Sequence, residues 1–168
     1  MNSLRLYIYR LITSLLPETS CFGLKVCLLR WCGAKIGKNV RIGSSAVFLG
    51  TGALTIGDDV WIGANNFISP VTPASITIGS HCDLGPGVMI ITGSHEIDPV
   101  GDHTAGKGIA SSVSIGEGCW LGARSTILPG VNLARKTLVA AGSVVTQNVE
   151  GESMLVAGVP AELKRGLS

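Results

Sequence analysis

Aromatic residues are scarce in this chain of 168 residues, where Phe, Trp and Tyr together make up 5%. There is no heptad pattern and no collagen-like repeat, which excludes coiled-coil and triple-helical assemblies. No apolar run is long enough to span a bilayer. The first residues also make a poor signal peptide, because Arg10 interrupts the apolar residues and no small-x-small cleavage site follows. The remaining expectation is one domain with a small appendage.

A repeat of six residues runs from Ile115 to Thr146. An α-helix repeats every 3.6 residues and a flat strand every two, so neither explains this period. Three short faces joined by tight corners do explain it, with about 18 residues in each triangular coil. Glycine, with 23 residues, suits the many corners. The pattern therefore predicts an all-β solenoid, a parallel β-helix in which one aliphatic residue of each six points inward.

The same phase recurs upstream and predicts about five coils. Their inward residues are Ile36, Ile42 and Phe48; Ile56, Ile62 and Ile68; Ile78, Leu84 and Ile90; Ile115, Leu121 and Ile127; and Leu133, Val139 and Val145. The phase breaks only between coils, and the longest break follows the third coil. A solenoid tolerates extra chain at a corner but not within a stacked face. We therefore expect one protruding loop, residues 96–114, directly after His95.

Three parts are expected along the chain: an amphipathic helical segment at 1–33, the β-helix at 34–160 and a C-terminal tail at 161–168. Apolar residues recur at helical spacing within 3–16 and 20–32. Residues 1–41 hold seven Lys and Arg but only one acid. We expect the helices to cap the open end of the β-helix, whose edge needs protection. Peripheral contact between residues 1–41 and an anionic membrane is a second, compatible interpretation.

The five cysteines show no CxxC spacing, which argues against a metal or redox motif. Cys82 and Cys119 occupy small inward positions of the repeat. We interpret them as reduced thiols in the core of a cytoplasmic protein.

Several motifs carry a family resemblance: ITGSHEIDP, IGEGCWLGARSTILPGV, VAAGSVVT and VAGVPAELKR. They resemble the hexapeptide-repeat O-acetyltransferases, above all the sugar and exopolysaccharide acetyltransferases related to galactoside and maltose acetyltransferase. The likeness covers about residues 33–165. It implies a left-handed β-helix, a homotrimer with active sites between subunits, and acetyl transfer from acetyl-CoA to a sugar hydroxyl. It also implies a role in cell-surface polysaccharide biosynthesis.

His95 is the candidate general base, because neutral imidazole titrates near working pH and can deprotonate a hydroxyl. The sequence has no GxSxG elbow and no Cys-His signature, so direct transfer is expected rather than an acyl-enzyme. Glu96, Asp98 or Asp83 would orient the imidazole, and the sequence does not choose among them.

The resemblance also assigns binding residues. It places Asn65 against the acceptor sugar, although a corner residue with a positive φ angle explains Asn65 equally well. Four positions would flank the pantetheine arm of acetyl-CoA: Trp120, Ala123, Ala141 and Thr146. Lys164 and Arg165 resemble the basic tail that meets the CoA phosphates.

Three alternatives stay open. The loop 98–113 is glycine-rich and unlike that of the sugar enzymes, so a serine-type or other small acceptor is one of them. A γ-class carbonic anhydrase needs three zinc-binding histidines; His81, His95 and His103 are present, but the closely spaced pair is missing. A non-catalytic β-helix is the third. We expect no metal and no nucleic-acid partner. We regard His81 and His103 as incidental to the chemistry, although His103, within the loop, could reach an acceptor.

Overall fold

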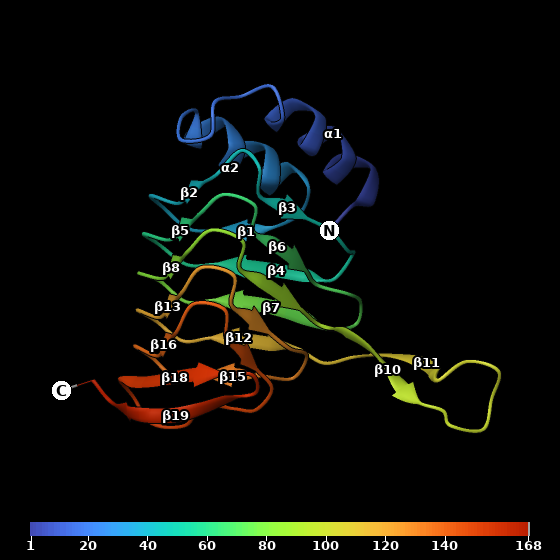
Figure 1. Cartoon of the computed structure of the whole chain (residues 1–168). Coiled ribbons are helices and arrows are strands. Elements are labelled where there is room, and N and C mark those ends of the chain that lie inside the picture. The colour runs from blue at the N-terminus through green and yellow to red at the C-terminus, as the bar shows by residue number, and fades with distance from the viewer. Residues whose placement is uncertain (168) are drawn as a thin grey trace.

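Three parallel sheets form the sides of a triangular prism, which two helices cover at one end (Figure 1). The computed structural model describes residues 1–167. Sheet A contains β1 (Lys35–Ile36), β4 (Ala53–Ile56), β7 (Ser75–Ile78), β12 (Val113–Ile115) and β15 (Asn132–Leu133). Sheet B contains β2 (Arg41–Ile42), β5 (Trp61–Ile62), β8 (Asp83–Leu84), β13 (Trp120–Leu121), β16 (Leu138–Val139), β18 (Met154–Gly158) and β19 (Ala161–Gly166). Sheet C contains β3 (Val47–Phe48), β6 (Phe67–Ser69), β9 (Met89–Ile91), β14 (Thr126–Ile127) and β17 (Val144–Val145).

Each coil contributes one strand to every sheet, and the predicted inward residues stack in register from coil to coil. In sheet B this column consists of the predicted residues Ile42, Ile62, Leu84, Leu121 and Val139, and Val156, which the repeat did not predict, extends it. All six side chains are buried in one continuous core. The predicted β-helix of about five coils and the phase of its repeat are thus confirmed.

A hairpin projects from the prism between the third and fourth coils (Figure 1). It consists of β10 (Gly93–Ile97) paired antiparallel with β11 (Ala105–Ala110). The predicted loop began at residue 96, but pairing already begins where Gly93 faces Ala110. The expectation that His95 lies at a corner of the prism is therefore wrong, because its backbone belongs to the hairpin.

The two helices, α1 (Ser3–Thr13) and α2 (Phe22–Trp31), cap the first coil as predicted. Leu6 and Leu29 join the same core as the β-helix. Tyr9 is buried as well, and the edge of its ring meets Phe48 with centroids 5.8 Å apart. The apolar faces of the helices thus shield the end of the prism from water.

Two of the basic residues expected to face a membrane instead fasten the helices to the first coil. Lys25 is fully buried, and its Nζ donates hydrogen bonds to the carbonyls of Glu18 (2.9 Å) and Ile42 (2.8 Å). Burial lowers the pKa of this amine. Arg30 donates to the carbonyls of Ile36 and Gly37.

An apolar strip remains exposed on the outer side of α1. Leu4, Tyr7 and Leu11 form it, at positions that repeat every three to four residues, and the exposed Leu15 follows just beyond the end of the helix. Arg10, on the same helix, is exposed too. Contact between residues 1–41 and an anionic membrane stays a prediction, and this strip is the apolar surface available for it. Within residues 1–167 there is no helix long and apolar enough to cross a bilayer.

The C-terminal segment differs from the tail that the sequence predicted at 161–168. Residues Ala161–Gly166 form β19, which pairs antiparallel with β18 and completes sheet B at the end opposite the helices. This strand occupies the hydrogen-bonding edge of β18. Ser168 lies outside the described residues.

The inward thiols behave as predicted. Cys82 and Cys119 are buried, and their Sγ atoms donate to the carbonyls of Gly116 (3.1 Å) and Ala134 (3.2 Å). They therefore fill small inward corners of the prism.

Candidate active site

His95 lies exposed on β10, and a backbone carbonyl holds its ring. The imidazole Nδ1 lies 2.9 Å from the carbonyl oxygen of Gly106 on the facing strand. A carbonyl oxygen only accepts hydrogen bonds, so Nδ1 carries the proton in this arrangement. The neutral ring then has its lone pair on Nε2, which is the atom able to take a proton from a substrate hydroxyl.

The carbonyl of Gly106 takes the place of the acid that the sequence suggested. Both turn N–H groups of Val100 and Gly101 donate to Oδ1 of Asp98, at 3.0 and 2.9 Å, and these bonds lower the pKa of that carboxyl. Asp83 lies in sheet B, away from the hairpin. Of the described residues, no carboxylate hydrogen bonds to His95. Because any residue type supplies a carbonyl, no sequence signal could have identified this one.

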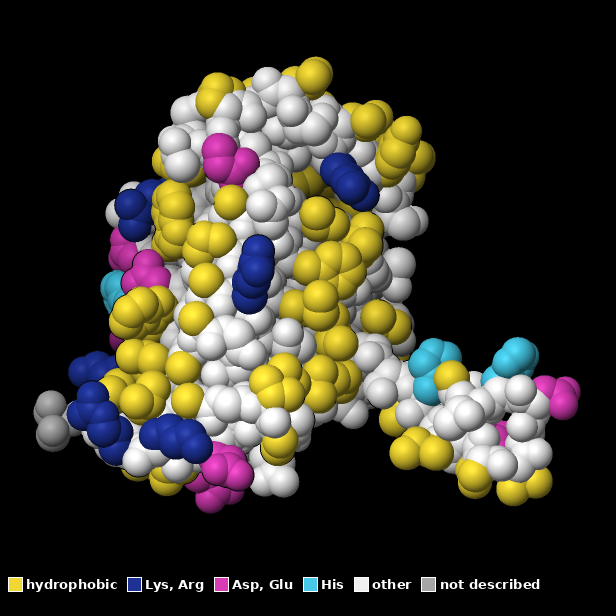
Figure 2. All heavy atoms as spheres, viewed as in Figure 1, with side chains coloured by type: hydrophobic (Ala, Val, Ile, Leu, Met, Phe, Trp, Pro, Cys, Tyr) yellow, Lys and Arg dark blue, Asp and Glu magenta, His cyan; other side chains and the backbone are white. Residues whose placement is uncertain are grey.

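One histidine lies on the wall of the prism, and the other two lie on the projecting hairpin (Figure 2). His103 is exposed in the connection between β10 and β11. His81 occupies a corner of the prism with φ of 59°, and its Nδ1 lies 3.7 Å from Oδ2 of Asp59. No group of three His, Cys, Asp or Glu side chains within residues 1–167 is arranged to hold a metal ion.

A shallow groove runs beside His95, where the base of the hairpin meets the connection between β6 and β7. Its walls are Val71, Thr72 and Pro73 on one side, and Gly93, Ser94, His95, Gly108, Ile109 and Ala110 on the other. The groove places an apolar surface next to the imidazole, where substrate atoms can approach it.

The residues expected to bind acetyl-CoA lie elsewhere on the prism. Trp120 projects outward from sheet B and is 56% exposed. Ala123 and Ala141 are partly or fully exposed and occupy one corner in successive coils, where the N–H of Gly142 donates to the carbonyl of Ala123. Thr146 is exposed directly after β17.

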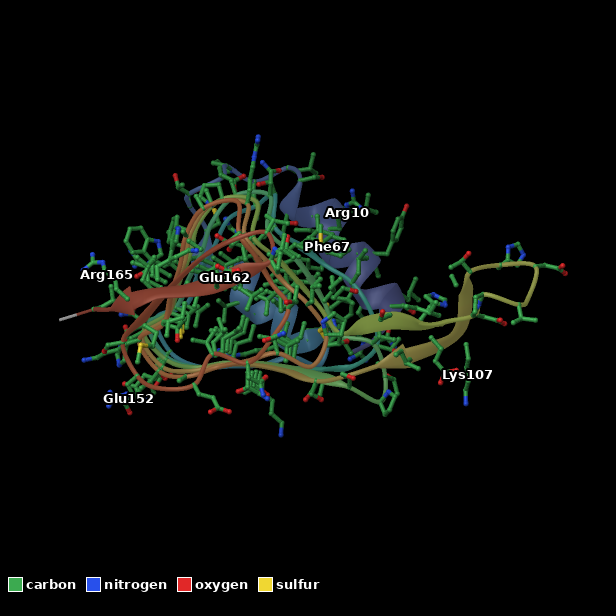
Figure 3. The ribbon with its side chains drawn as sticks, turned by 60° about the horizontal axis from the view of Figure 1, so that its bottom comes forward. Arg10, Phe67, Lys107, Glu152, Glu162 and Arg165 are labelled. Carbon is green, nitrogen blue, oxygen red and sulfur yellow. The ribbon has the colours of Figure 1, made fainter. Side chains whose placement is uncertain are left out.

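The basic pair Lys164 and Arg165 is exposed on β19, and Nζ of Lys164 lies 3.3 Å from Oε2 of Glu162. Figure 3 shows Arg165 and the hairpin residue Lys107 at opposite ends of the molecule. One chain therefore does not bring His95 together with Trp120 or with this basic pair.

Asn65 lies at a corner with φ of 55°, so the predicted positive φ angle is confirmed. Its N–H donates to Oγ of Ser45 (2.9 Å) and its side chain is exposed. The neighbouring Asn66 is buried instead, and its Nδ2 donates to the carbonyls of Gly63 and Gly85. Contact between Asn65 and an acceptor stays a prediction.

The motifs gave no prediction for Trp61, yet the structure places it in register with Asp83, which in turn is in register with Trp120. Each of the three stands one residue before an inward aliphatic residue of sheet B. This shared position in the repeat could have identified Trp61 from the sequence, because residues on either side of an inward position point outward.

Residues 53–91 and 112–147 match the family model described as the hexapeptide repeat of succinyl-transferase. The chain is 36% identical over 138 residues to WcaF of Escherichia coli (strain K12), which is provisionally named a colanic acid biosynthesis acetyltransferase. That match covers 82% of this chain and 72% of WcaF. The galactoside O-acetyltransferase of Lactococcus lactis is 31% identical over 149 residues, covering 84% of this chain and 67% of that enzyme.

Solved structures show the same fold. The hexapeptide-repeat acetyltransferase VCA0836 of Vibrio cholerae, complexed with acetyl-coenzyme A, superimposes with a TM-score of 0.74 at 26% identity, covering 98% of this chain and 86% of that one. A galactoside acetyltransferase in complex with coenzyme A gives a TM-score of 0.79 at 22% identity, covering 98% and 80%.

Proposed function

The chain belongs to the hexapeptide-repeat acetyltransferases, and from this premise we propose that it transfers the acetyl group of acetyl-CoA to a hydroxyl group of a saccharide. The observation that carries the proposal is the exposed imidazole of His95, whose Nδ1 is engaged by a carbonyl and whose Nε2 is left as a base. The named roles of WcaF and of the galactoside enzyme favour a sugar acceptor in polysaccharide synthesis.

In this mechanism Nε2 of His95 takes the proton of the acceptor hydroxyl as its oxygen attacks the thioester carbonyl. A C–O bond forms, and the C–S bond breaks when the tetrahedral intermediate collapses. The imidazolium then gives its proton to the leaving thiolate, so that coenzyme A is released as a thiol. The hydrogen bond from Nδ1 to Gly106 keeps the ring oriented throughout and stabilises its protonated form.

We further propose that three copies assemble and that each site lies between two of them. The hairpin carries His95 away from the prism, whereas Trp120 and the corner at Ala123 and Ala141 lie on the prism wall. In the assembled trimer, the hairpin of one copy would face this prism wall on a neighbouring copy, and the active site would lie between them. The exposed Lys164 and Arg165 would meet the phosphates of acetyl-CoA. Outward apolar residues of sheet C, such as Val47, Phe67 and Met89, offer a surface for packing between copies.

A panel of acceptors tests the proposed activity. Release of the CoA thiol from acetyl-CoA should rise above the acceptor-free rate with at least one free, nucleotide-linked or lipid-linked sugar. Mass spectrometry should then find one acetyl ester on that sugar. Serine serves as the control acceptor, because it represents the non-sugar alternative. Stimulation by serine alone, or by none of the sugars, would contradict the proposal.

A further inference from the structure

A ladder of outward side chains crosses the exposed side of sheet B. Cα pairing aligns Arg41 with Trp61, Trp61 with Asp83, and Asp83 with Trp120 in the neighbouring strands β2, β5, β8 and β13. Neighbouring strands lie about 4.8 Å apart, so the two indoles are separated by roughly 10 Å with the carboxylate between them. Both aromatic residues therefore flank one acid on a flat, regular surface.

The first indole is held in place by its neighbours. The guanidinium of Arg41 lies over the ring of Trp61, 5.1 Å from its centroid. Phe22 of α2 meets the same ring edge-on at 6.0 Å. Trp61 is consequently half-buried, and the guanidinium covers one face of its indole, so that a sugar ring can stack only on the other face.

The other two members are open to a ligand. Trp120 is 56% exposed, so much of its large apolar surface remains in water. Asp83 is exposed, and among residues 1–167 no hydrogen bond or ion pair engages its carboxylate. A carboxylate accepts hydrogen bonds at several lone pairs and binds neighbouring hydroxyl groups well. The ladder thus offers two apolar rings and one free acceptor.

We infer that the ladder of Trp61, Asp83 and Trp120 is a binding site for an extended saccharide. The indoles stack on the apolar faces of two sugar rings, and Asp83 accepts hydrogen bonds from their hydroxyl groups. This inference rests on the proposed function and deepens it, because it makes the acceptor an oligosaccharide rather than a single sugar. Asn65, the predicted acceptor residue, follows Trp61 in the same coil, which places the ladder beside a predicted acceptor position. The family resemblance put Trp120 beside the pantetheine arm, and this inference assigns its indole to the saccharide instead.

Calorimetric titration of the full chain with galactotetraose, maltotetraose and cellotetraose, without acetyl-CoA, tests the site. At least one of the three should bind saturably. Asp83→Ala should weaken its binding about tenfold, since a hydrogen bond to a charged group is lost. Asp83→Asn should weaken it less, and Trp61→Ala should weaken it by at least as much as Asp83→Ala. Glu150→Ala removes another exposed acid, away from the ladder, and should leave binding unchanged.

Two results would overturn the inference: no binding of any tetrasaccharide to the unaltered chain, or equal binding by the chain and by both Asp83 variants. These results are separable from failure of the proposed function. If sugars are acetylated while the Asp83 variants keep the acceptor KM, the ladder is wrong and the activity stands. If a tetrasaccharide binds through the ladder but no sugar is acetylated, the binding site stands and the activity is wrong.

Discussion

Replacing His95 with alanine is expected to lower kcat by about 10²–10⁴-fold, the usual contribution of a general base. The variant has no group at this position to accept the hydroxyl proton as the C–O bond forms. The KM for acetyl-CoA should change little, because the residues proposed to bind it lie on the prism wall. The melting temperature should also be retained, since the side chain is exposed on a projecting hairpin. Steady-state release of the CoA thiol measures kcat and KM, and thermal unfolding measures the melting temperature.

His103→Ala is the matched control, because it removes an exposed imidazole from the same hairpin. It should leave kcat within about twofold of the unaltered chain, as expected for a residue outside the chemistry. Near-normal turnover by His95→Ala, or an equal loss in both variants, would refute the assignment of His95 as the base.

Leu84→Ala is expected to lower the free energy of unfolding by about 2–5 kcal/mol, because it opens a cavity in a core with little freedom to collapse. Leu84 is fully buried on β8, stacked between Ile62 of the second coil and Leu121 of the fourth. Loss of its side chain therefore removes contacts with two coils at once. Denaturant unfolding at a fixed protein concentration measures the change.

Thr77→Ala provides the comparison for this core variant. Thr77 lies on the neighbouring strand of the same coil, but its side chain points outward and is exposed. Its replacement should change the free energy of unfolding by about 0.5 kcal/mol or less, as is usual for surface positions. Similar small changes in both variants would mean that the inward column does not hold the coils together.

The core was predictable from the sequence because a single periodic rule governs it. Every residue in phase with Ile115 faces inward, so the phase alone placed Leu84 and Val139 in one column. The helical cap followed similarly from apolar residues at helical spacing. Lys25 departed from its expected exposure because its long side chain reaches two carbonyls of the capped end. Composition cannot distinguish such a buried amine from a solvated one.

The candidate site was less predictable, since its geometry depends on the backbone. His95 was identified through a motif, but the carbonyl of Gly106 that holds it comes from the facing strand of the hairpin. The sequence placed the start of the projecting segment at residue 96 rather than at Gly93. The two strands of the hairpin begin to pair before the six-residue repeat is interrupted, so the repeat does not mark where the hairpin starts. Trp61 gained significance only when pairing aligned it with Asp83 and Trp120.

The central claim is that His95 of one copy acts on acetyl-CoA held by a neighbouring copy. Its most direct test mixes His95→Ala chains with Ala141→Trp chains, in which the bulky ring would fill the proposed pantetheine path. Each variant alone should be nearly inactive as a trimer of three times 17.3 kDa, checked by light scattering. After subunit exchange at equal amounts, about one quarter of the sites should combine an intact His95 with an intact Ala141 wall, so activity should return to roughly that fraction. If exchange is complete and the mixture stays as inactive as its parents, the site lies within one chain and the shared arrangement is wrong.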